Sequence, residues 1–474
     1  MAVRSIESIE LKGQSKVSRI ACDTVAVTDE HPQLAASIAT SLRANGCSVQ
    51  VTCSPDALTQ ELVVTLALGD GNACDIHWRA LAQAQAFHRA GGKSLVLLQD
   101  TGGRFDTGGP SHGWHGGMAA LARTIALEWP QMRVRCVDLA VDSDDIQGTT
   151  QRLMAALASM QCVVGSDLSG RLYSLQAVER MSERVPVTTP TLATDVWLVS
   201  GGARGVTAAC IEALAKRTPG RFALLGRSVP AEWPSNIAQT GDIKELRRLL
   251  AASALAAGER PEPKDIERIA RQALAGQEIR STLIALEAAG VTARYYACNI
   301  AEPQQVDEVV ARIQRELGPV TAMVHGAGVL ADSLLVDKTR SELQRVFETK
   351  VGGLQNLLEA LGDTVLTHMA LFSSAAAFYG NTGQADYAMA NDVLNRVAKS
   401  FKQRWPAATV KSFNWGPWDS GMVDQTLARY FEERGIGLIP VQEGAALFAD
   451  EMLSADKGAV ELLVGDAWAN SRAS

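Results

Sequence analysis

A glycine-rich turn between an apolar run and a helix-like stretch constrains this chain more than any other feature. Its residues are V-W-L-V-S-G-G-A-R-G-V-T, from Val196 to Thr207. The apolar run predicts a buried parallel strand, and the A-A-C-I-E-A-L-A-K that follows predicts a helix. Glycines between them let the backbone approach a pyrophosphate, which the amides at a helix N-terminus favour. Because the third glycine of G-x-G-x-x-G is missing, an ordinary strand-to-helix turn is the alternative.

Three more turns follow strand-like runs. R-F-A-L-L ends in Gly226-Arg227-Ser228, Y-Y-A-C-N-I contains Asn299, and A-M-V-H-G-A-G ends in Gly326 to Gly328. An acidic residue after the second strand suits the ribose of NAD, whereas an arginine suits a 2′-phosphate, so the sequence predicts NADPH. We expect His325 to be a wall residue. The predicted cofactor residues are Gly201, Gly202, Ala203, Arg204, Gly205, Val206, Arg227, Ser228, Asn299, Ile300, Gly326, Ala327, Gly328, Lys350, Tyr387 and Pro417.

Four polar residues downstream form a candidate catalytic group. Ser374 precedes Tyr387 by thirteen residues, Lys350 precedes Ser374 by twenty-four, and Asn391 follows Tyr387 by four. A phenol that protonates a carbonyl oxygen near neutral pH needs a cation that eases loss of its proton and a hydroxyl that holds the substrate. Tyr387 is the predicted acid, Lys350 the cation and Ser374 the hydroxyl, while Asn391 positions the lysine or a water. Ser373 is the alternative serine, although strand alternation points it to the opposite face.

These segments resemble a known family. The matching stretches are S-G-G-A-R-G-V, G-R-S, H-G-A-G-V-L-A-D-S, E-T-K-V-G-G-L, F-S-S-A-A-A-F-Y-G-N-T-G-Q-A-D-Y-A-M-A-N and N-W-G-P-W. Residues 195–465 thereby resemble the ketoreductase domain of modular polyketide synthases, and most of all those of bacterial polyunsaturated fatty acid synthases, within the short-chain dehydrogenase/reductase superfamily. Most of that superfamily carries Tyr-x-x-x-Lys, but these ketoreductases exchange lysine and asparagine, as Lys350 and Asn391 do here. Thr207 departs from the usual glycine, which puts a close helix-to-strand approach in question.

The resemblance implies NADPH-dependent reduction of a β-ketoacyl chain, carried by an acyl carrier protein, beside neighbouring synthase domains. Leu330-Ala331-Asp332 keeps the second aspartate of a Leu-Asp-Asp motif that accompanies B-type reduction, and Tyr379 stands where a tryptophan accompanies the opposite A-type outcome. Asp332 and Tyr379 are therefore predicted to guide the substrate toward a (3R)-hydroxyacyl product, although Asp332 could instead cap the following helix. One alternative is an inactive scaffold. The other is a free-standing dehydrogenase or epimerase, which Asn391 disfavours because it stands where the Tyr-x-x-x-Lys motif has lysine.

The first half of the chain predicts a second α/β unit. Its strand-like runs are D-T-V-A-V, C-S-V-Q-V, L-V-V-T-L-A-L, K-S-L-V-L-L and M-R-V-R-C-V-D-L. Superposing Trp129 on Trp405 puts Ser111 opposite Tyr387 and His115 opposite Asn391, while Asp29, Glu30 and Gln33 fall opposite Gly201, Gly202 and Gly205. We therefore predict an α/β fold of two Rossmann-like subdomains. Residues 1–190 form a truncated structural one, and residues 191–474 form a catalytic one with a doubly wound parallel sheet.

Two segments of the second half have no obvious place in this fold. Residues 229–290 contain a helix-like run, a break at Pro261 and Pro263, and a second helix-like run. Their charges predict a solvated face, and a docking site for neighbouring synthase domains is the alternative. Residues 419–440 follow N-W-G-P-W, where the superfamily carries a mobile lid, with a plain surface loop as the alternative.

Composition fits a chain with substantial cores and excludes several classes of function. The 474 residues are 47% hydrophobic, and no apolar run approaches the roughly 20 residues that span a bilayer. The polar start is no signal peptide, so a cytoplasmic location is expected. Eight cysteines without a C-x-x-C pair and seven histidines without ligand spacing predict no metal site. A formal charge of −7 argues against nucleic acid as a partner.

Overall fold

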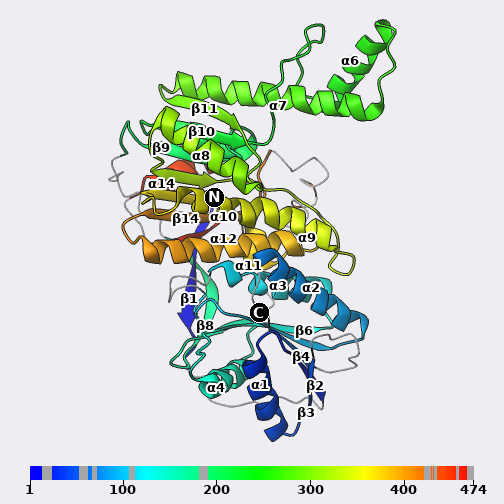
Figure 1. Cartoon of the computed structure of the whole chain (residues 1–474), viewed down its shortest axis with the longest axis vertical. Helices are drawn as coiled ribbons and strands as arrows, with labels where there is room; N and C mark the ends of the chain where they lie inside the picture. The colour runs from blue at the N-terminus through cyan, green and yellow to red at the C-terminus, as the bar shows by residue number, and fades with distance from the viewer. Residues whose placement is uncertain are drawn as a thin grey trace.

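A computed structural model describes residues 1–12, 24–52, 62–66, 72–105, 113–180, 191–420, 429, 431, 435–454 and 458–466. In this part of the chain, fifteen strands form one sheet in the order β11-β10-β9-β12-β13-β14-β15-β1-β8-β7-β6-β5-β4-β2-β3 (Figure 1). The strands are β1 (Val3–Glu10), β2 (Thr24–Thr28), β3 (Ser48–Thr52), β4 (Leu62–Leu66), β5 (Ser94–Gln99), β6 (Arg133–Leu139), β7 (Val163–Ser166), β8 (Leu172–Glu179), β9 (Val196–Ser200), β10 (Arg221–Gly226), β11 (Thr292–Ala297), β12 (Ala322–His325), β13 (His368–Ser374), β14 (Thr409–Trp415) and β15 (Glu461–Val464).

The helices connect these strands and cover both faces of the sheet. They are α1 (Pro32–Ala44), α2 (Ala73–Arg89), α3 (Met118–Glu128), α4 (Ile146–Leu157), α5 (Gly205–Ala215), α6 (Ile243–Ala256), α7 (Pro263–Ala288), α8 (Pro303–Leu317), α9 (Arg340–Phe347), α10 (Gly353–Leu361), α11 (Ala375–Tyr379), α12 (Ala385–Arg404) and α14 (Val441–Met452). Two short turns, η1 (Gly113–His115) and the π-helical η2 (Glu348–Gly352), precede α3 and α10. No helix of the described ranges is long and apolar enough to cross a membrane.

The second half of the chain is a doubly wound parallel sheet, as predicted. Strands β9 to β15 run parallel in the order β11-β10-β9-β12-β13-β14-β15. Alternation along β9 sends Trp197 and Val199 into the core under α5 and α14, and Val196 and Leu198 into the core on the other face. The near-continuous apolar runs of the sequence follow from burial on both faces.

The first half repeats this arrangement with one strand fewer. Its parallel order β3-β2-β4-β5-β6-β7 matches β10-β9-β12-β13-β14-β15, and no described strand of this half corresponds to β11. The internal repeat is also visible at two helix ends. Trp129 caps α3 at φ −124° and ψ 67°, and Trp405 caps α12 at φ −126° and ψ 71°. The predicted fold of two Rossmann-like units, the first of them truncated, is confirmed.

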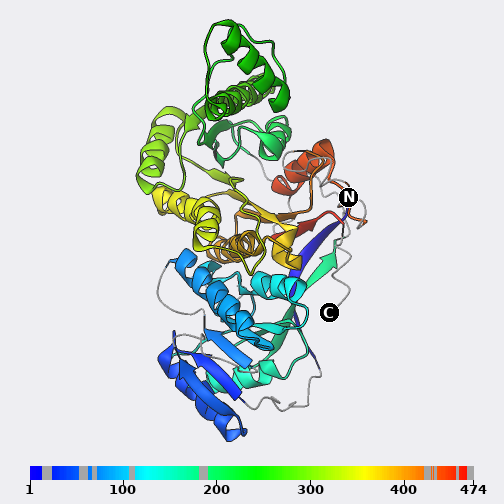
Figure 2. The same cartoon turned by 90° about the vertical axis from the view of Figure 1, so that its right-hand side faces the viewer.

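The join between the halves was not predicted from the sequence. β1 pairs antiparallel with β15 on one side and with β8 on the other, so the first strand of the chain bridges the two parallel sheets. Helices α3 and α12 pack against each other, and one apolar cluster runs across the join from Leu97 and Leu121 to Val393. The two halves therefore share a core and are stacked along the long axis of the molecule (Figures 1 and 2).

The insertion at residues 229–290 forms the two helices expected of it, α6 and α7. α7 packs against β11 and α5, while α6 and the adjoining first part of α7 project beyond the end of the sheet (Figures 1 and 2). Pro263 opens α7 at its first turn, where proline is tolerated, and the helix then runs 26 residues to Ala288. A small core around Leu246, Ala270 and Ala273 holds the pair together. Most of the predicted lid, residues 419–440, lies outside the described residues.

Candidate active site

The glycine-rich turn after β9 lies against the turn after β12. Gly201 has φ +71°, and a Cβ there would come 2.9 Å from the Ala327 nitrogen, so a side chain would collide with the neighbouring turn. Gly202 and Ala203 are buried, whereas Arg204 and Gly205 are exposed and Val206 is half-buried at the start of α5. No side chain caps this helix N-terminus, which leaves its amides available to an anion. These features fit the pyrophosphate of a dinucleotide.

The helix approaches this turn in spite of Thr207. The threonine is buried, and a Cβ added at Gly326 would lie 2.5 Å from its hydroxyl oxygen. The Thr207 side chain thus occupies space that Gly326 leaves open on the facing strand end. The glycine at position 326 therefore leaves room for the threonine at position 207.

The remaining predicted cofactor residues line the same edge of the sheet, at the carboxyl ends of the parallel strands. Arg227 is exposed after β10, and the Ser228 carbonyl accepts a 2.6 Å hydrogen bond from the Tyr295 hydroxyl of β11. Asn299 turns the chain after β11, and the carbonyl of buried Ile300 accepts a hydrogen bond from Asn356. Pro417 follows β14, and its carbonyl accepts a hydrogen bond from the Ile439 amide. Ligands of doubly wound sheets bind at this edge.

Lys350 lies in the π-helical turn η2, directly beside the glycine turn. A Cβ at Gly328 would come 2.8 Å from the lysine Cε. The Lys350 ammonium is buried and donates to the Phe372 carbonyl at 2.9 Å, and burial lowers its pKa to about 7. The buried His325 ring stands between the Ser200 hydroxyl at 2.7 Å and the Lys350 carbonyl at 2.9 Å. A neutral ring satisfies both partners, and burial lowers the pKa of His325 to about 3, so His325 holds the turn as a wall residue.

Tyr387 and Asn391 lie one turn apart on α12, and Ser374 ends the adjacent β13. The Lys350 ammonium lies 5.3 Å from the centre of the Tyr387 ring, so all four predicted catalytic residues converge. Burial raises the pKa of Tyr387, hydrogen bonds with the Asn391 and Ser374 side chains oppose this shift, and the charge of Asp332 adds to it. The lowered tyrosine pKa expected beside Lys350 is not found, because burial outweighs the hydrogen bonds.

The two neighbouring polar side chains have separate tasks. Ser373 is buried, and its hydroxyl lies 3.1 Å from two acceptors, the Asn391 carbonyl and the Asn414 side-chain oxygen, which share its one proton, so it is not available to a substrate. The Asn391 side chain donates to the Tyr387 carbonyl at 2.8 Å, while its own Oδ1 is buried without a hydrogen-bond partner among the described residues. A buried amide oxygen without a partner calls for a donor, and a water or a lysine proton would supply one.

The two predicted substrate-guiding residues have different hydrogen-bond partners. Asp332 is exposed and accepts hydrogen bonds from Gln384, the residue before α12, at 3.2 and 3.1 Å. The capping alternative is wrong, because the next helix, α9, is capped by Thr339. Tyr379 accepts a 3.3 Å hydrogen bond from Arg4 of β1.

Sequence reasoning missed a buried ion pair beneath this site. Lys338 and Asp386 are 3.0 Å apart with both side chains buried, and Lys338 also donates to the Ala331 carbonyl. The Asp386 carboxylate accepts a hydrogen bond from the Tyr387 amide at 2.9 Å. The pair thus ties the Leu330-Ala331-Asp332 segment to the start of α12. The unusual aspartate directly before the tyrosine was the available signal.

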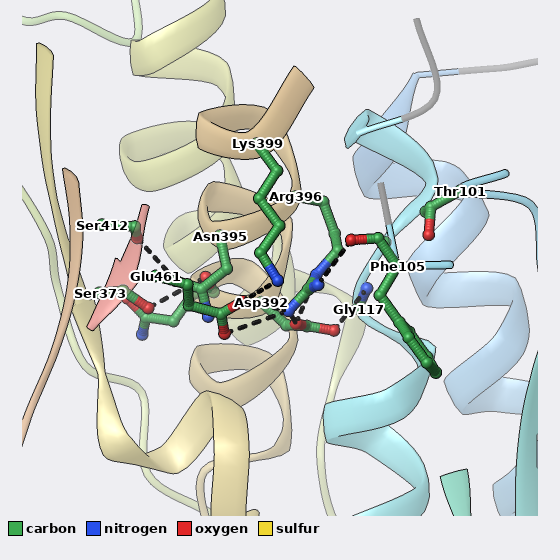
Figure 3. Close-up of polar contacts among 12 residues, drawn as sticks. Thr101, Phe105, Gly117, Ser373, Asp392, Asn395, Arg396, Lys399, Ser412 and Glu461 are labelled. Atoms are coloured by element: carbon green, nitrogen blue, oxygen red, sulfur yellow. Dashed lines mark hydrogen bonds and ion pairs between the residues drawn. The ribbon is translucent and has the colours of Figure 1, made fainter. Parts of the chain in front are cut away.

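A second buried network holds the middle of α12 against the first half of the chain (Figure 3). Arg396 binds Asp392 and Glu461, each at 3.0 Å, and donates to the Phe105 carbonyl at 3.0 Å. The Gly117 amide, which precedes α3, donates to Asp392 at 3.1 Å. The helix that carries Tyr387 is therefore braced by residues of the first half.

Comparisons with known proteins agree with this geometry. Residues 195–420 match the family described as KR domain. A polyunsaturated fatty acid synthase protein of Thraustochytrium sp. is 36% identical over 363 residues, which are 74% of this chain and 13% of that protein. A phenolphthiocerol/phthiocerol polyketide synthase protein of Mycobacterium tuberculosis is 25% identical over 342 residues, 72% of this chain and 16% of that protein.

A solved structure described as an A1-type ketoreductase covers 98% of this chain and 92% of its own, with a TM-score of 0.74 and 22% identity, which supports the fold. The chain spans only a small part of the two synthase proteins it matches. Residues 195–420 therefore belong to the KR-domain family, and the chain is similar to parts of polyketide and polyunsaturated fatty acid synthase proteins.

Proposed function

We propose that this chain catalyses the NADPH-dependent reduction of a β-ketoacyl chain on an acyl carrier protein to a β-hydroxyacyl chain, within a larger synthase. The observation that carries the proposal is the convergence of Lys350, Ser374, Tyr387 and Asn391 beside a glycine-lined sheet edge. The lysine and asparagine occupy the exchanged positions, which disfavours a free-standing dehydrogenase. No member of the group is missing, which disfavours an inactive scaffold.

The reduced nicotinamide, when bound, supplies the hydride for the β-carbon. Tyr387 holds its proton at neutral pH because burial raises its pKa, so the phenol enters the reaction as the acid for the developing alkoxide. Ser374 orients the substrate carbonyl by a hydrogen bond. Lys350, with a pKa near 7, can return a proton toward Tyr387 after each turnover.

The glycine turns and the two arginines would hold the cofactor. Gly205 leaves open space at the start of α5, where the pyrophosphate would bind, and Gly201 and Gly328 let the neighbouring turn and Lys350 come close. Arg204 and Arg227 stand at the ends of β9 and β10, where a 2′-phosphate would be recognised.

NADPH oxidation with a β-ketoacyl thioester tests the proposal. We expect turnover with NADPH, and slower turnover with NADH at equal concentration. Binding of NADPH without turnover at any chain length would favour the inactive scaffold instead.

We also propose B-type reduction and a (3R)-hydroxyacyl product, supported by Asp332 beside the start of the catalytic helix. A carboxylate there would guide the pantetheine arm from one side, so that one face of the ketone meets the nicotinamide. Chiral chromatography of the product decides this point, and a predominantly 3S alcohol contradicts it.

A further inference from the structure

The long insertion helix α7 contacts the glycine-rich turn. The Thr282 hydroxyl donates to the Ala203 carbonyl at 3.0 Å, one residue before Arg204. One turn earlier on α7, Glu278 accepts a hydrogen bond from Nε of Arg204. Part of the insertion therefore forms a wall of the predicted cofactor site.

Arg204 also interacts electrostatically with Tyr295 of β11, whose hydroxyl contacts the turn after β10. The charge of Arg204 lowers the pKa of the Tyr295 hydroxyl, although burial outweighs it and raises that pKa to about 12. The same hydroxyl donates to the Ser228 carbonyl at 2.6 Å, and a Cβ at Gly226 would lie 2.8 Å from it. Arg204 is thus placed beside the Gly226-Arg227-Ser228 turn.

The α7 backbone is fixed on both sides of Glu278. A Cβ at Gly276 would lie 2.2 Å from the Ala231 carbonyl oxygen, so helix and loop are in contact there. Arg280 donates to the same carbonyl at 2.8 Å. Glu278 is therefore presented from a firmly packed turn of helix, although its own side chain is about half exposed.

We propose that Glu278 is a positioning residue for recognition of the cofactor's 2′-phosphate, acting through Arg204. This inference rests on the proposed use of NADPH. A guanidinium offers five N–H donors in a fixed plane, and the bond to Glu278 uses Nε. No other hydrogen bond or ion pair of the Arg204 side chain involves the described residues, so its terminal nitrogens remain for a phosphate.

The exposure of the pair makes the idea testable without loss of the fold. Side chains that are 47% and 48% exposed form a pair that solvent screens and that adds little to stability. Removing Glu278 frees the long arginine side chain, which must then be ordered when phosphate binds. The expected cost is about threefold to fivefold in NADPH affinity, the size of an exposed ion-pair contribution.

Dissociation constants for NADPH and NADH are measured by nucleotide fluorescence on the intact chain. Glu278→Ala should weaken NADPH binding about threefold to fivefold and leave NADH unchanged. Glu278→Gln keeps an acceptor for Nε and should stay close to the wild type. In an Arg204→Ala background, Glu278→Ala should have no further effect. Glu287→Ala, an exposed position on the same helix, is the control.

Three outcomes overturn the inference. Unchanged NADPH affinity in Glu278→Ala would show that Arg204 needs no positioning, and tighter binding would show that the carboxylate competes with the phosphate. Equal loss of NADPH and NADH affinity would indicate general damage to the turn. If the wild-type chain itself shows no preference for NADPH, the proposed cofactor fails first, which separates the two failures.

Discussion

The two halves of the chain share the order of six parallel strands but differ at the two places where chemistry is expected. After β9 the chain passes through Gly201, Gly202 and Gly205 into α5, with Gly201 and Gly205 at positive φ. After β2 the matched turn carries Asp29 and Glu30, and the Glu30 carboxylate accepts a 2.5 Å hydrogen bond from Gln83. A carboxylate at this edge repels a pyrophosphate. Both halves therefore have a turn at the place where a dinucleotide could bind, after β2 and after β9. The residues of each turn decide whether the pyrophosphate can bind there.

The second difference lies at the start of one helix. With Trp129 and Trp405 matched, the first residue of α3, Met118, corresponds to Leu394 in α12. α12 begins nine residues earlier, and that extension carries Tyr387 and Asn391. In the first half the corresponding stretch contains the short turn η1 with His115, while Ser111 lies outside the described residues. The turn of α12 that carries the proposed catalytic residues therefore has no counterpart in α3.

What the first half contributes is support for this extension. The Glu128 carboxylate at the end of α3 accepts hydrogen bonds from the Leu335 amide at 2.6 Å and from the Gly383 amide at 2.8 Å. Gln85 of α2 donates to the Leu335 and Lys338 carbonyls. The segment after Asp332 and the turn before Tyr387 are thus both fixed by a half that carries none of the proposed catalytic residues.

The largest expected effect comes from Tyr387→Phe. The variant keeps the packed ring and loses the proposed proton donor, so turnover should fall about a hundredfold to ten-thousandfold while NADPH still binds. Ketoacyl thioester reduction and nucleotide titration measure the two properties. His115→Ala, at the position matched to Asn391, should reduce turnover far less, and an equal loss would place chemistry in the first half.

Arg396→Met tests whether the halves unfold together. The change leaves Asp392 and Glu461 buried without their shared cation, and we expect a loss of about 3–5 kcal/mol in the free energy of unfolding. Urea unfolding followed by tryptophan fluorescence and by circular dichroism should show one transition at lower urea. Lys399→Met removes a cation that pairs with Glu461 and should cost less, because Arg396 still pairs with that carboxylate. Two separated transitions in the wild type would contradict a shared core.

Local patterns of the sequence were enough to predict most of the second half. The apolar runs of β9, β10, β12, β13 and β14 are buried on both faces, so their residues alone indicate parallel strands. The spacing of Lys350, Ser374, Tyr387 and Asn391 selected residues that do converge. These features depend on neighbours within one strand-turn-helix unit, where sequence is informative.

The features that were missed depend on partners far along the chain. β1 reads V-R-S-I-E-S-I-E, and its place becomes clear only when β8 and β15 supply the two neighbours. Arg396 stands in a helix that reads as polar, yet it is buried because Glu461 and the Phe105 carbonyl reach it. Glu278 read as one charge on a solvated helix until the fold placed it beside Arg204. Neither burial nor pairing of a charge is visible in local periodicity.

A smaller effect is expected for Lys350→Met, which should change how the stability of the chain depends on pH. Burial lowers the pKa of Lys350 from 10.5 to about 7 in the folded chain, whereas the unfolded chain keeps the ordinary value. Between these values the unfolded state binds more protons, so the stability of the wild type relative to the variant rises with pH. The difference should level off below about pH 7 and reach at most a few kcal/mol. Unfolding curves at several pH values measure it, and a constant difference would contradict the buried lysine.

The smallest expected effect compares the two matched turns directly. In Gly201→Ala, the residue must adopt a backbone φ of +71°, and its new methyl group would lie 2.9 Å from the Ala327 nitrogen. One of the two turns therefore has to move. A side chain at positive φ is strained by itself, and we expect a loss of about 1–2 kcal/mol in stability together with weaker NADPH binding. Asp29→Ala at the matched position of the first half should change neither property by more than about 0.5 kcal/mol, as surface substitutions usually do. Thermal unfolding and nucleotide titration of both variants give the comparison. The prediction depends on the close approach of Gly201 to the turn after β12. Equal losses of stability and NADPH affinity in Gly201→Ala and Asp29→Ala would therefore contradict it.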